Sequence, residues 1–251
     1  EHRLDCGPFV KGAIETRKKI QTLACEKDHL MDLTLGGLSG MYHVGQDKIV
    51  WAQDGFHGMP FLRSSDILDA DITESLFISR KQVAGNSLFQ CPAGTTLITR
   101  SGTIGRMTYM RPDMTDTAIS QDVLKVVPDT SKVNAGYLYA FLKSRFGLPM
   151  VTGGTFGSII VHIEAENIAD LLVPRLGAVE DQDHELIQRA ANAQVESGEL
   201  RKHAGSMVNE ICGFPERLAP AARIFAYSSA NSNDVLRRLD ATFHNPIAQQ
   251  A

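Results

Sequence analysis

The sequence predicts an α+β protein, in which a domain with a mixed or mostly antiparallel sheet is followed by a long coiled-coil helix. Two patterns carry this prediction. Short apolar or alternating runs, separated by Gly, Asp and Asn, extend to about residue 130, and an unbroken heptad repeat occupies residues 179 to 212. We expect three regions: a domain at 1–177, a helix at 178–212, and a linker with the opening of a second, truncated domain at 213–251.

The domain begins with an expected helix and continues with strands. The helix is expected at residues 11 to 24, where Ile14, Ile20 and Leu23 lie among Lys and Arg. The runs typical of strands are Lys48 to Ala52, Pro60 to Arg63, Ser75 to Ser79, Thr95 to Thr99, Arg106 to Met110 and Val123 to Val127. Each run is short and bounded by turn residues, as in an antiparallel or mixed sheet.

A helical pattern at residues 135 to 146 interrupts the strands. It places Tyr137 and Phe141 on one apolar face, which we expect to pack in the core beneath the sheet, and it ends at Gly147. The elements expected after it are a glycine-rich stretch at 153–158, an apolar run from Ile159 to Ile163, a helical turn near 164–169, and a strand from Leu171 to Val173 ended by Pro174.

The helix expected at residues 179 to 212 carries a narrow apolar stripe. Its positions are spaced alternately by four and three residues, a pattern that favours pairing with another helix; they are Leu186, Ala190, Ala193, Ser197, Leu200, Ala204, Met207 and Ile211. Acidic residues crowd the start and Gly213 marks the end. Such a helix is about 50 Å long. The alternative interpretation is an ordinary amphipathic helix on a core.

The charge of the chain is unevenly distributed. The formal net charge is −4 over 251 residues, of which 43% are hydrophobic and 22% charged. Residues 80–145 hold nine Lys or Arg and four acidic residues, a local balance of +5, whereas residues 178–251 have a balance of −3. A basic segment beside an acidic helix predicts a polyanion-binding face next to a protein-binding one.

The sequence also predicts a cytoplasmic protein without catalytic or metal chemistry. Its four cysteines lie far apart with no C-x-x-C pair, which argues against zinc and predicts reduced thiols, and no apolar run is as long as a membrane span. The phosphate loop, H-E-x-x-H and G-x-S-x-G motifs are all missing. His162-Ile163-Glu164 imitates a deaminase H-x-E but lacks the P-C-x-x-C partner. We expect no cofactor.

Two glycine-rich loops and several cations are the candidates for contacting nucleic acid. The segment from Arg100 to Arg106 offers hydroxyls, backbone N–H groups and two guanidiniums, which suit phosphates or base edges. The candidate DNA-binding residues are Arg63, Arg80, Lys81, Arg100, Ser101, Thr103, Arg106, Thr155 and Ser158. The alternatives are a purely structural hairpin turn at 100–106 and a structural loop at 153–158.

Several motifs occur together in an order that resembles a known family. They are Gly58 to Ile67, Ser101 to Arg106, Ala118 to Asp122, Gly136 to Ser144, Gly157-Ser158, and Leu172 to Pro174 with an acidic, Gln-containing helix start behind it. Arg3-Leu4-Asp5 also returns as Arg238-Leu239-Asp240 after the helix. Over residues 2 to 212 the chain resembles the specificity (S) subunit of type I restriction-modification systems, which act in phage defence.

The resemblance implies a fold, a role and partners. S subunits have two target recognition domains separated by long, antiparallel paired helices, and each domain reads one half of a split sequence in double-stranded DNA. Methyltransferase subunits hold the helices and the DNA and methylate adenine, and restriction subunits join through them, so the S subunit is not an enzyme. This chain has one such domain and one helix, which implies either a piece of a longer protein or a half-length form that dimerises.

Two other functions remain open from the sequence. One is the recognition domain of a fused methyltransferase-nuclease or of another phage-defence methyltransferase. The other is an adaptor that does not bind DNA and uses its coiled coil to assemble a complex. An S-adenosylmethionine motif in the same chain would favour the first alternative, and failure to bind any duplex would favour the second.

Overall fold

The computed structural model describes residues 11–69, 76–153 and 162–212. The chain divides into two compact units, Glu1–Gly198 and Glu199–Ala251, and the division falls inside the long helix α6 (Ala178–Cys212). The truncated second domain that the sequence predicts at 213–251 lies outside the described residues. Within those residues, no helix has the length and apolar character needed to cross a membrane.

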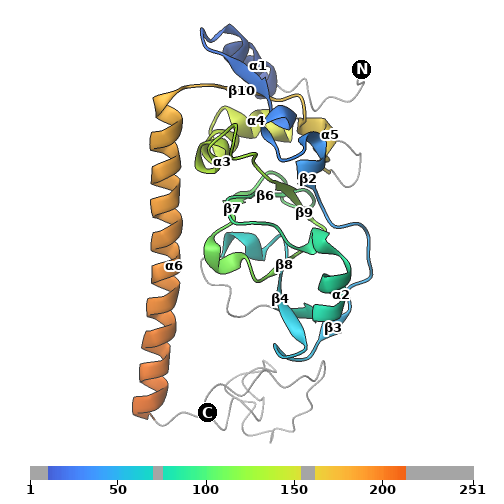
Figure 1. The fold of residues 1–251 in the computed structure, drawn as a ribbon, viewed down its shortest axis with the longest axis vertical. Coiled ribbons are helices and arrows are strands. Elements are labelled where there is room, and N and C mark those ends of the chain that lie inside the picture. The colour runs from blue at the N-terminus through green and yellow to red at the C-terminus, as the bar shows by residue number, and fades with distance from the viewer. Residues whose placement is uncertain (1–10, 70–75, 154–161, 213–251) are drawn as a thin grey trace, which may run out of the picture. The chain divides into compact units, whose positions relative to one another are not determined.

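Two four-stranded sheets form the centre of the first unit (Figure 1). The first is antiparallel and has the order β2-β9-β6-β7. The second has the order β3-β5-β4-β8 and is mixed, because β4 and β8 are parallel. The strands are β2 (Met41–Tyr42), β3 (Trp51–Ala52), β4 (Gly58–Leu62), β5 (Leu76–Ser79), β6 (Thr96–Thr99), β7 (Met107–Tyr109), β8 (Ala118–Ile119) and β9 (Val123–Val126). The predicted α+β class with mixed and antiparallel sheets is confirmed.

A third pairing joins distant parts of the chain. Strand β1 (Lys27–His29) pairs antiparallel with β10 (Leu172–Pro174), so that Asp28 lies opposite Val173. Because β10 immediately precedes α6, this ribbon determines where the long helix begins. The sequence predicted β10 as a strand, but β1 is too short and polar to give a periodic signal.

Four helices lie at the end of the unit that carries the β1–β10 ribbon (Figure 1). They are α1 (Lys11–Thr22), α3 (Ala135–Lys143), α4 (Gly147–Thr152) and α5 (Ala165–Ile168), and α2 (Arg80–Gly85) follows β5. Short 3₁₀ turns occupy Leu30–Leu33, Gly37–Gly40, Asp66–Leu68, Ser87–Phe89 and Pro112–Met114. Tyr137 and Phe141 on α3 are buried in the main apolar cluster, which confirms the expected core face.

The chain turns sharply between α3 and α4, where the sequence predicted only a stop. Ser144 Oγ accepts hydrogen bonds from the backbone N–H groups of Phe146 and Gly147, both at 3.1 Å, and so caps the new helix. A Cβ on Gly147 would lie 2.1 Å from the carbonyl oxygen of Phe141, so only glycine fits there. Pro149 is accommodated because it lies in the first turn, where its missing N–H is not needed.

The helix predicted at residues 179 to 212 is continuous over 35 residues, Ala178–Cys212. Its first five turns dock on the domain through four polar contacts. Asn134 Nδ2 donates to Asp181 Oδ1 at 2.7 Å, the Gly136 N–H donates to His184 Nδ1 at 3.0 Å, Gln188 Nε2 donates to the Tyr109 hydroxyl at 2.5 Å, and Arg111 Nη1 donates to Gln194 Oε1 at 3.4 Å. With the buried Ala191 and the partly buried Ile187, which packs against the main apolar cluster, these helix residues form the docking face: Asp181, His184, Ile187, Gln188, Ala191 and Gln194.

Candidate nucleic-acid interface

The loop from Arg100 to Arg106 is a tight hairpin between β6 and β7. Thr99 pins it, since its Oγ1 donates to the Thr103 carbonyl at 2.5 Å and accepts from the Arg106 N–H at 3.0 Å. Gly102 and Gly105 have positive φ angles of 69° and 78°, which glycine adopts without strain. Thr103 is exposed in the turn and Arg106 is exposed at its base, next to β7, and the Arg106 guanidinium has no ion pair among the described residues. The loop is therefore a hairpin turn that also presents a cation.

Arg100 points into the protein and not toward solvent. Its side chain is 11% exposed and forms an ion pair with Glu164, and its Nε donates to the Ile163 carbonyl at 3.3 Å. The other Glu164 oxygen lies 3.0 Å from His43 Nε2. Arg100 therefore connects the end of β6 to the start of α5, and its guanidinium is engaged within the protein.

The described residues that flank the 154–161 segment lie beside the 100–106 loop, although about 50 residues separate them along the chain. The Ile163 N–H donates to the Arg100 carbonyl at 3.1 Å, and a Cβ on Gly105 would lie 2.6 Å from Thr152 Cγ2. Both described ends of the 154–161 segment thus lie beside the 100–106 loop. Thr155 and Ser158, which the sequence suggested as DNA contacts, lie outside the described residues.

The remaining candidates lie at opposite ends of β4. Arg63 follows the strand and forms a two-pronged ion pair with Asp66, at 2.8 and 3.0 Å. This end is continuous with the 100–106 loop, because the Ser120 N–H donates to the Leu62 carbonyl and Ser101 Oγ donates to Asp122. The other two, Arg80 and Lys81, begin α2 near the opposite end of the strand, and both are exposed.

Three of the nine bases in the 80–145 segment do not contribute to a positive surface. Arg100 is paired with Glu164, and Arg111 is 2% exposed and bonded to Asp113 at 2.9 and 3.0 Å. Lys125 on β9 is fully buried, with its Nζ 5.5 Å from the centre of the Tyr42 ring. Burial lowers the pKa of Lys125 to about 8 and raises the pKa of neighbouring Cys91 to about 11. The local balance of +5 therefore overstates the surface charge.

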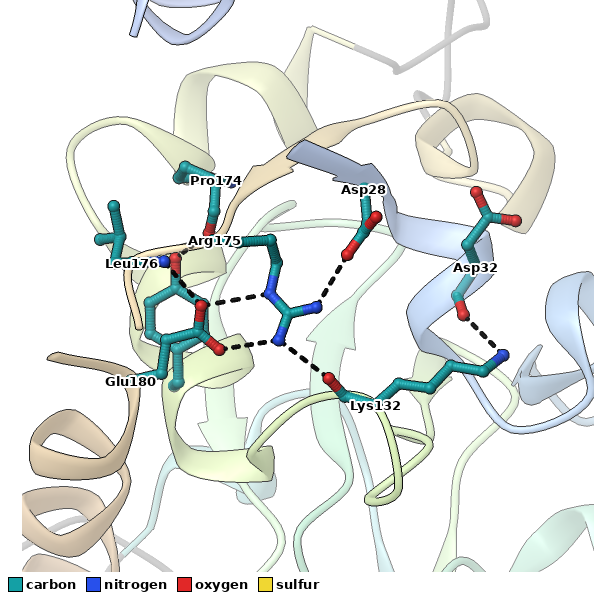
Figure 2. Close-up of polar contacts among 8 residues, drawn as sticks. Asp28, Asp32, Lys132, Pro174, Arg175, Leu176 and Glu180 are labelled. Atoms are coloured by element: carbon teal, nitrogen blue, oxygen red, sulfur yellow. Dashed lines mark hydrogen bonds and ion pairs between the residues drawn. The ribbon is translucent and has the colours of Figure 1, made fainter. Parts of the chain in front are cut away.

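A cluster around Arg175 joins the domain to the start of α6 (Figure 2). The Arg175 guanidinium contacts both Glu180 oxygens at 3.1 Å and donates to Asp28 at 2.8 Å and to the Lys132 carbonyl at 2.9 Å. Glu180 also accepts from the Leu176 N–H at 2.6 Å. These bonds raise the pKa of Arg175 above its usual value, and the Glu180 contact contributes most.

The cluster changes the interpretation of Glu180. The sequence suggested that this acid only favours the helix start, but it is 5% exposed and is the buried partner of Arg175. Nearby, the Tyr137 hydroxyl donates to the Pro174 carbonyl, and burial raises its pKa. The sequence contained no spacing signal for Arg175 because its partners come from three separate segments.

The predicted helix-pairing residues are all exposed. We call them the heptad stripe: Leu186, Ala190, Ala193, Ser197, Leu200, Ala204, Met207 and Ile211. The four large members are between 48% and 79% exposed. Leu186 follows His184 of the docking face by two residues, which places the two side chains roughly 160° apart around the helix. The stripe is thus available to a partner.

The likeness of this chain to known proteins lies in its structure. No protein-family model matches the chain, and no curated protein sequence matches it. Among solved structures, it is similar to the crystal structure of a type I restriction-modification system S subunit from M. genitalium, with 13% sequence identity and a TM-score of 0.45. The match covers 75% of this chain and 43% of that S subunit, so this chain spans less than half of the other's length. Within the described ranges, no group of three or more His, Cys, Asp or Glu side chains is placed to hold a metal ion.

Proposed function

We propose that this chain is a sequence-specific DNA recognition subunit of a type I restriction-modification complex, which reads one half of a bipartite site and docks methyltransferase subunits through α6. The observation that carries this proposal is the exposed heptad stripe on a helix whose other face is docked on its own domain. A stripe of this period suits a second helix. A domain joined to such a helix can be held at a set distance from a second domain.

The exposed loops support the DNA role. Arg106 offers a cation to phosphate, and Thr103 and the glycine backbone of the same hairpin can reach base edges. The ion pair of Arg63 with Asp66 leaves 56% of the Arg63 side chain exposed, so its guanidinium remains accessible to a DNA phosphate.

The proposed protein partners bind through the exposed heptad stripe of α6. The heptad stripe is proposed to bind a helix from a second recognition domain, either in a longer chain or in a second copy. Methyltransferase subunits supply the cofactor and the chemistry, and restriction subunits join through them. The chain itself is proposed to be non-catalytic and to bind neither S-adenosylmethionine nor ATP.

Methylation mapping of DNA treated with this chain and the methyltransferase subunits tests the proposal. Two readers at opposite ends of a helix about 50 Å long should contact half-sites about 10 to 15 base pairs apart, centre to centre. A single contiguous target would contradict the proposal.

Removing one heptad, residues 199–205, sharpens this test. The deletion keeps the period of the stripe and lies beyond Gln194, the last residue of the docking face. It shortens the helix by about 10 Å, so the permitted spacer should shrink by about three base pairs with unchanged half-sites. The control variant replaces Gly198 and Gly205 with Ala, which keeps the helix length. Altered half-sites with an unaltered spacer would exclude the helix as the ruler.

A further inference from the structure

The loop at residues 53–57, which connects β3 to β4, presents an apolar side chain to solvent. Phe56 is 84% exposed, more than any other large apolar side chain among the described residues. Its ring lies edge-on to the neighbouring His57 ring, with 4.8 Å between the ring centres. The next most exposed large apolar side chain, Ile211 at 79%, belongs to the heptad stripe and has a proposed partner. Phe56 does not belong to this stripe, so the proposed helix pairing does not account for its exposure.

The backbone under Phe56 is held in place. Asp54 Oδ1 accepts from the His57 N–H at 2.9 Å, and the Arg80 N–H donates to the His57 carbonyl at 3.1 Å. A Cβ on Gly58 would lie 2.5 Å from the Phe77 Cβ, so the end of the 53–57 loop packs tightly on β5. Phe56 is therefore presented by a fixed turn that keeps its ring in solvent.

The side chains beside the 53–57 loop carry positive charge, which favours binding of a nucleic acid. Arg80 and Lys81 lie beside it, and Arg80 Nη2 donates to the Gly55 carbonyl at 3.3 Å. Lys81 is exposed and has no ion-pair partner among the described residues. Apolar side chains flanked by cations are the means by which many proteins unstack a base step while holding the adjacent phosphates. The two cations outnumber the one acid of the loop, Asp54, and this charge arrangement favours DNA over an apolar protein partner.

The 53–57 loop precedes β4 and Arg63 follows it, so the two lie at opposite ends of this strand. A duplex lying along β4 would meet both ends.

We propose that Phe56 inserts between base pairs of the DNA that this domain reads, as an apolar wedge, with Arg80 and Lys81 on the flanking phosphates. This inference rests on the proposed DNA-recognition function. The wedge adds a contribution to specificity from base steps that unstack easily, in addition to any base-edge contacts of the 100–106 loop.

The test uses the full chain with methyltransferase subunits and a duplex carrying the mapped target, with 2-aminopurine at successive positions of one half-site. Wild-type protein should raise the 2-aminopurine fluorescence at one step. Phe56→Ala should abolish that rise and weaken binding about tenfold with an unchanged salt slope, whereas Phe56→Leu should keep most of both. Lys81→Ala should keep the rise and lower the salt slope by about one unit. Leu76→Ala, at an exposed apolar position on neighbouring β5, is the matched control and should change neither.

The outcomes separate the inference from the function on which it rests. If the wild-type chain binds the duplex and Phe56→Ala keeps both fluorescence and affinity, the wedge is wrong and the DNA role stands. If Phe56→Ala binds DNA normally but loses the methyltransferase subunits, the 53–57 loop contacts protein and the proposal of a wedge is again wrong. If the wild-type chain and its complex bind no duplex, both proposals fail.

Discussion

The two faces of α6 differ in the kind of contact that they are built to make. The docking face is mostly polar and holds its own domain through directional hydrogen bonds with Asn134, Gly136, Tyr109 and Arg111. The heptad stripe combines large apolar residues with small ones, and all of its members are exposed, Leu200 at 62%. Directional bonds set one register against the domain, whereas an apolar stripe with alanines favours close approach of another helix.

The difference between the two faces indicates that the contact of α6 with its own domain is the permanent one. Gly136 accommodates the docking face, since a Cβ there would lie 2.8 Å from the His184 Cα, and the buried Ala191 fills the remaining contact. On the other face, exposed Leu and Met side chains retain apolar surface that association would remove from water. The docking face thus belongs to the fold, and the heptad stripe is suited to assembly.

The largest expected effect comes from placing a charge in the stripe. Ala193→Glu should weaken helix pairing by about 3 kcal/mol or more, over 100-fold, because the new carboxylate would be buried without a partner. Sedimentation and methyltransferase capture measure the pairing, and circular dichroism checks that the domain remains folded. Asn192→Glu adds the same charge at a neighbouring position outside the stripe and should leave pairing intact. Retained pairing in Ala193→Glu would show that the stripe is not an interface.

A buried charge within the domain separates the domain's stability from assembly. Because the pKa of Lys125 falls from 10.5 to about 8 on folding, its burial costs stability below pH 8, and this cost disappears as the pH rises from 8 to 10.5. Lys125→Met should therefore raise the free energy of unfolding at pH 7, by about 1–2 kcal/mol. The gain should shrink toward pH 10.5 in urea titrations, and helix pairing should not change. A gain that is constant with pH would show that folding does not lower the pKa of Lys125.

A smaller effect is expected from the docking face. Gln188→Ala removes the donor to the Tyr109 hydroxyl and should lower the free energy of unfolding by about 1 kcal/mol. Hydrogen exchange in the first turns of α6 should quicken while partner binding keeps its affinity. Gln182→Ala, at an exposed position of the same helix, is the control. If Gln188→Ala weakens pairing as much as Ala193→Glu does, the two faces are not independent.

The smallest effect belongs to a residue on neither face. Arg106→Ala should weaken duplex binding several-fold and lower the slope of log affinity against log salt by about one unit, since one phosphate contact is lost. Fluorescence anisotropy at several salt concentrations measures both quantities, and Arg201→Ala on the helix is the control. An unchanged slope and affinity would place the DNA interface away from the 100–106 hairpin.

Local patterns were predictable from the sequence. The limits of α6, the heptad stripe and most strands follow from periodicity and turn residues, which act over a few neighbouring positions. The sequence also identified the 100–106 loop and the core face of α3. It did not predict the separate helix α4, because the Ser144 cap depends on the local turn geometry.

The tertiary structure alone decided which charges are at the surface. Arg100, Lys125 and Glu180 look like exposed charges in the sequence, yet each is buried or nearly so by segments far along the chain. The same holds for the pairing of β1 with β10 and for the hydrogen bond between Ile163 and Arg100. Residue type and spacing determine the local conformation of a segment, whereas burial and charge pairing depend on which distant segments the fold brings into contact.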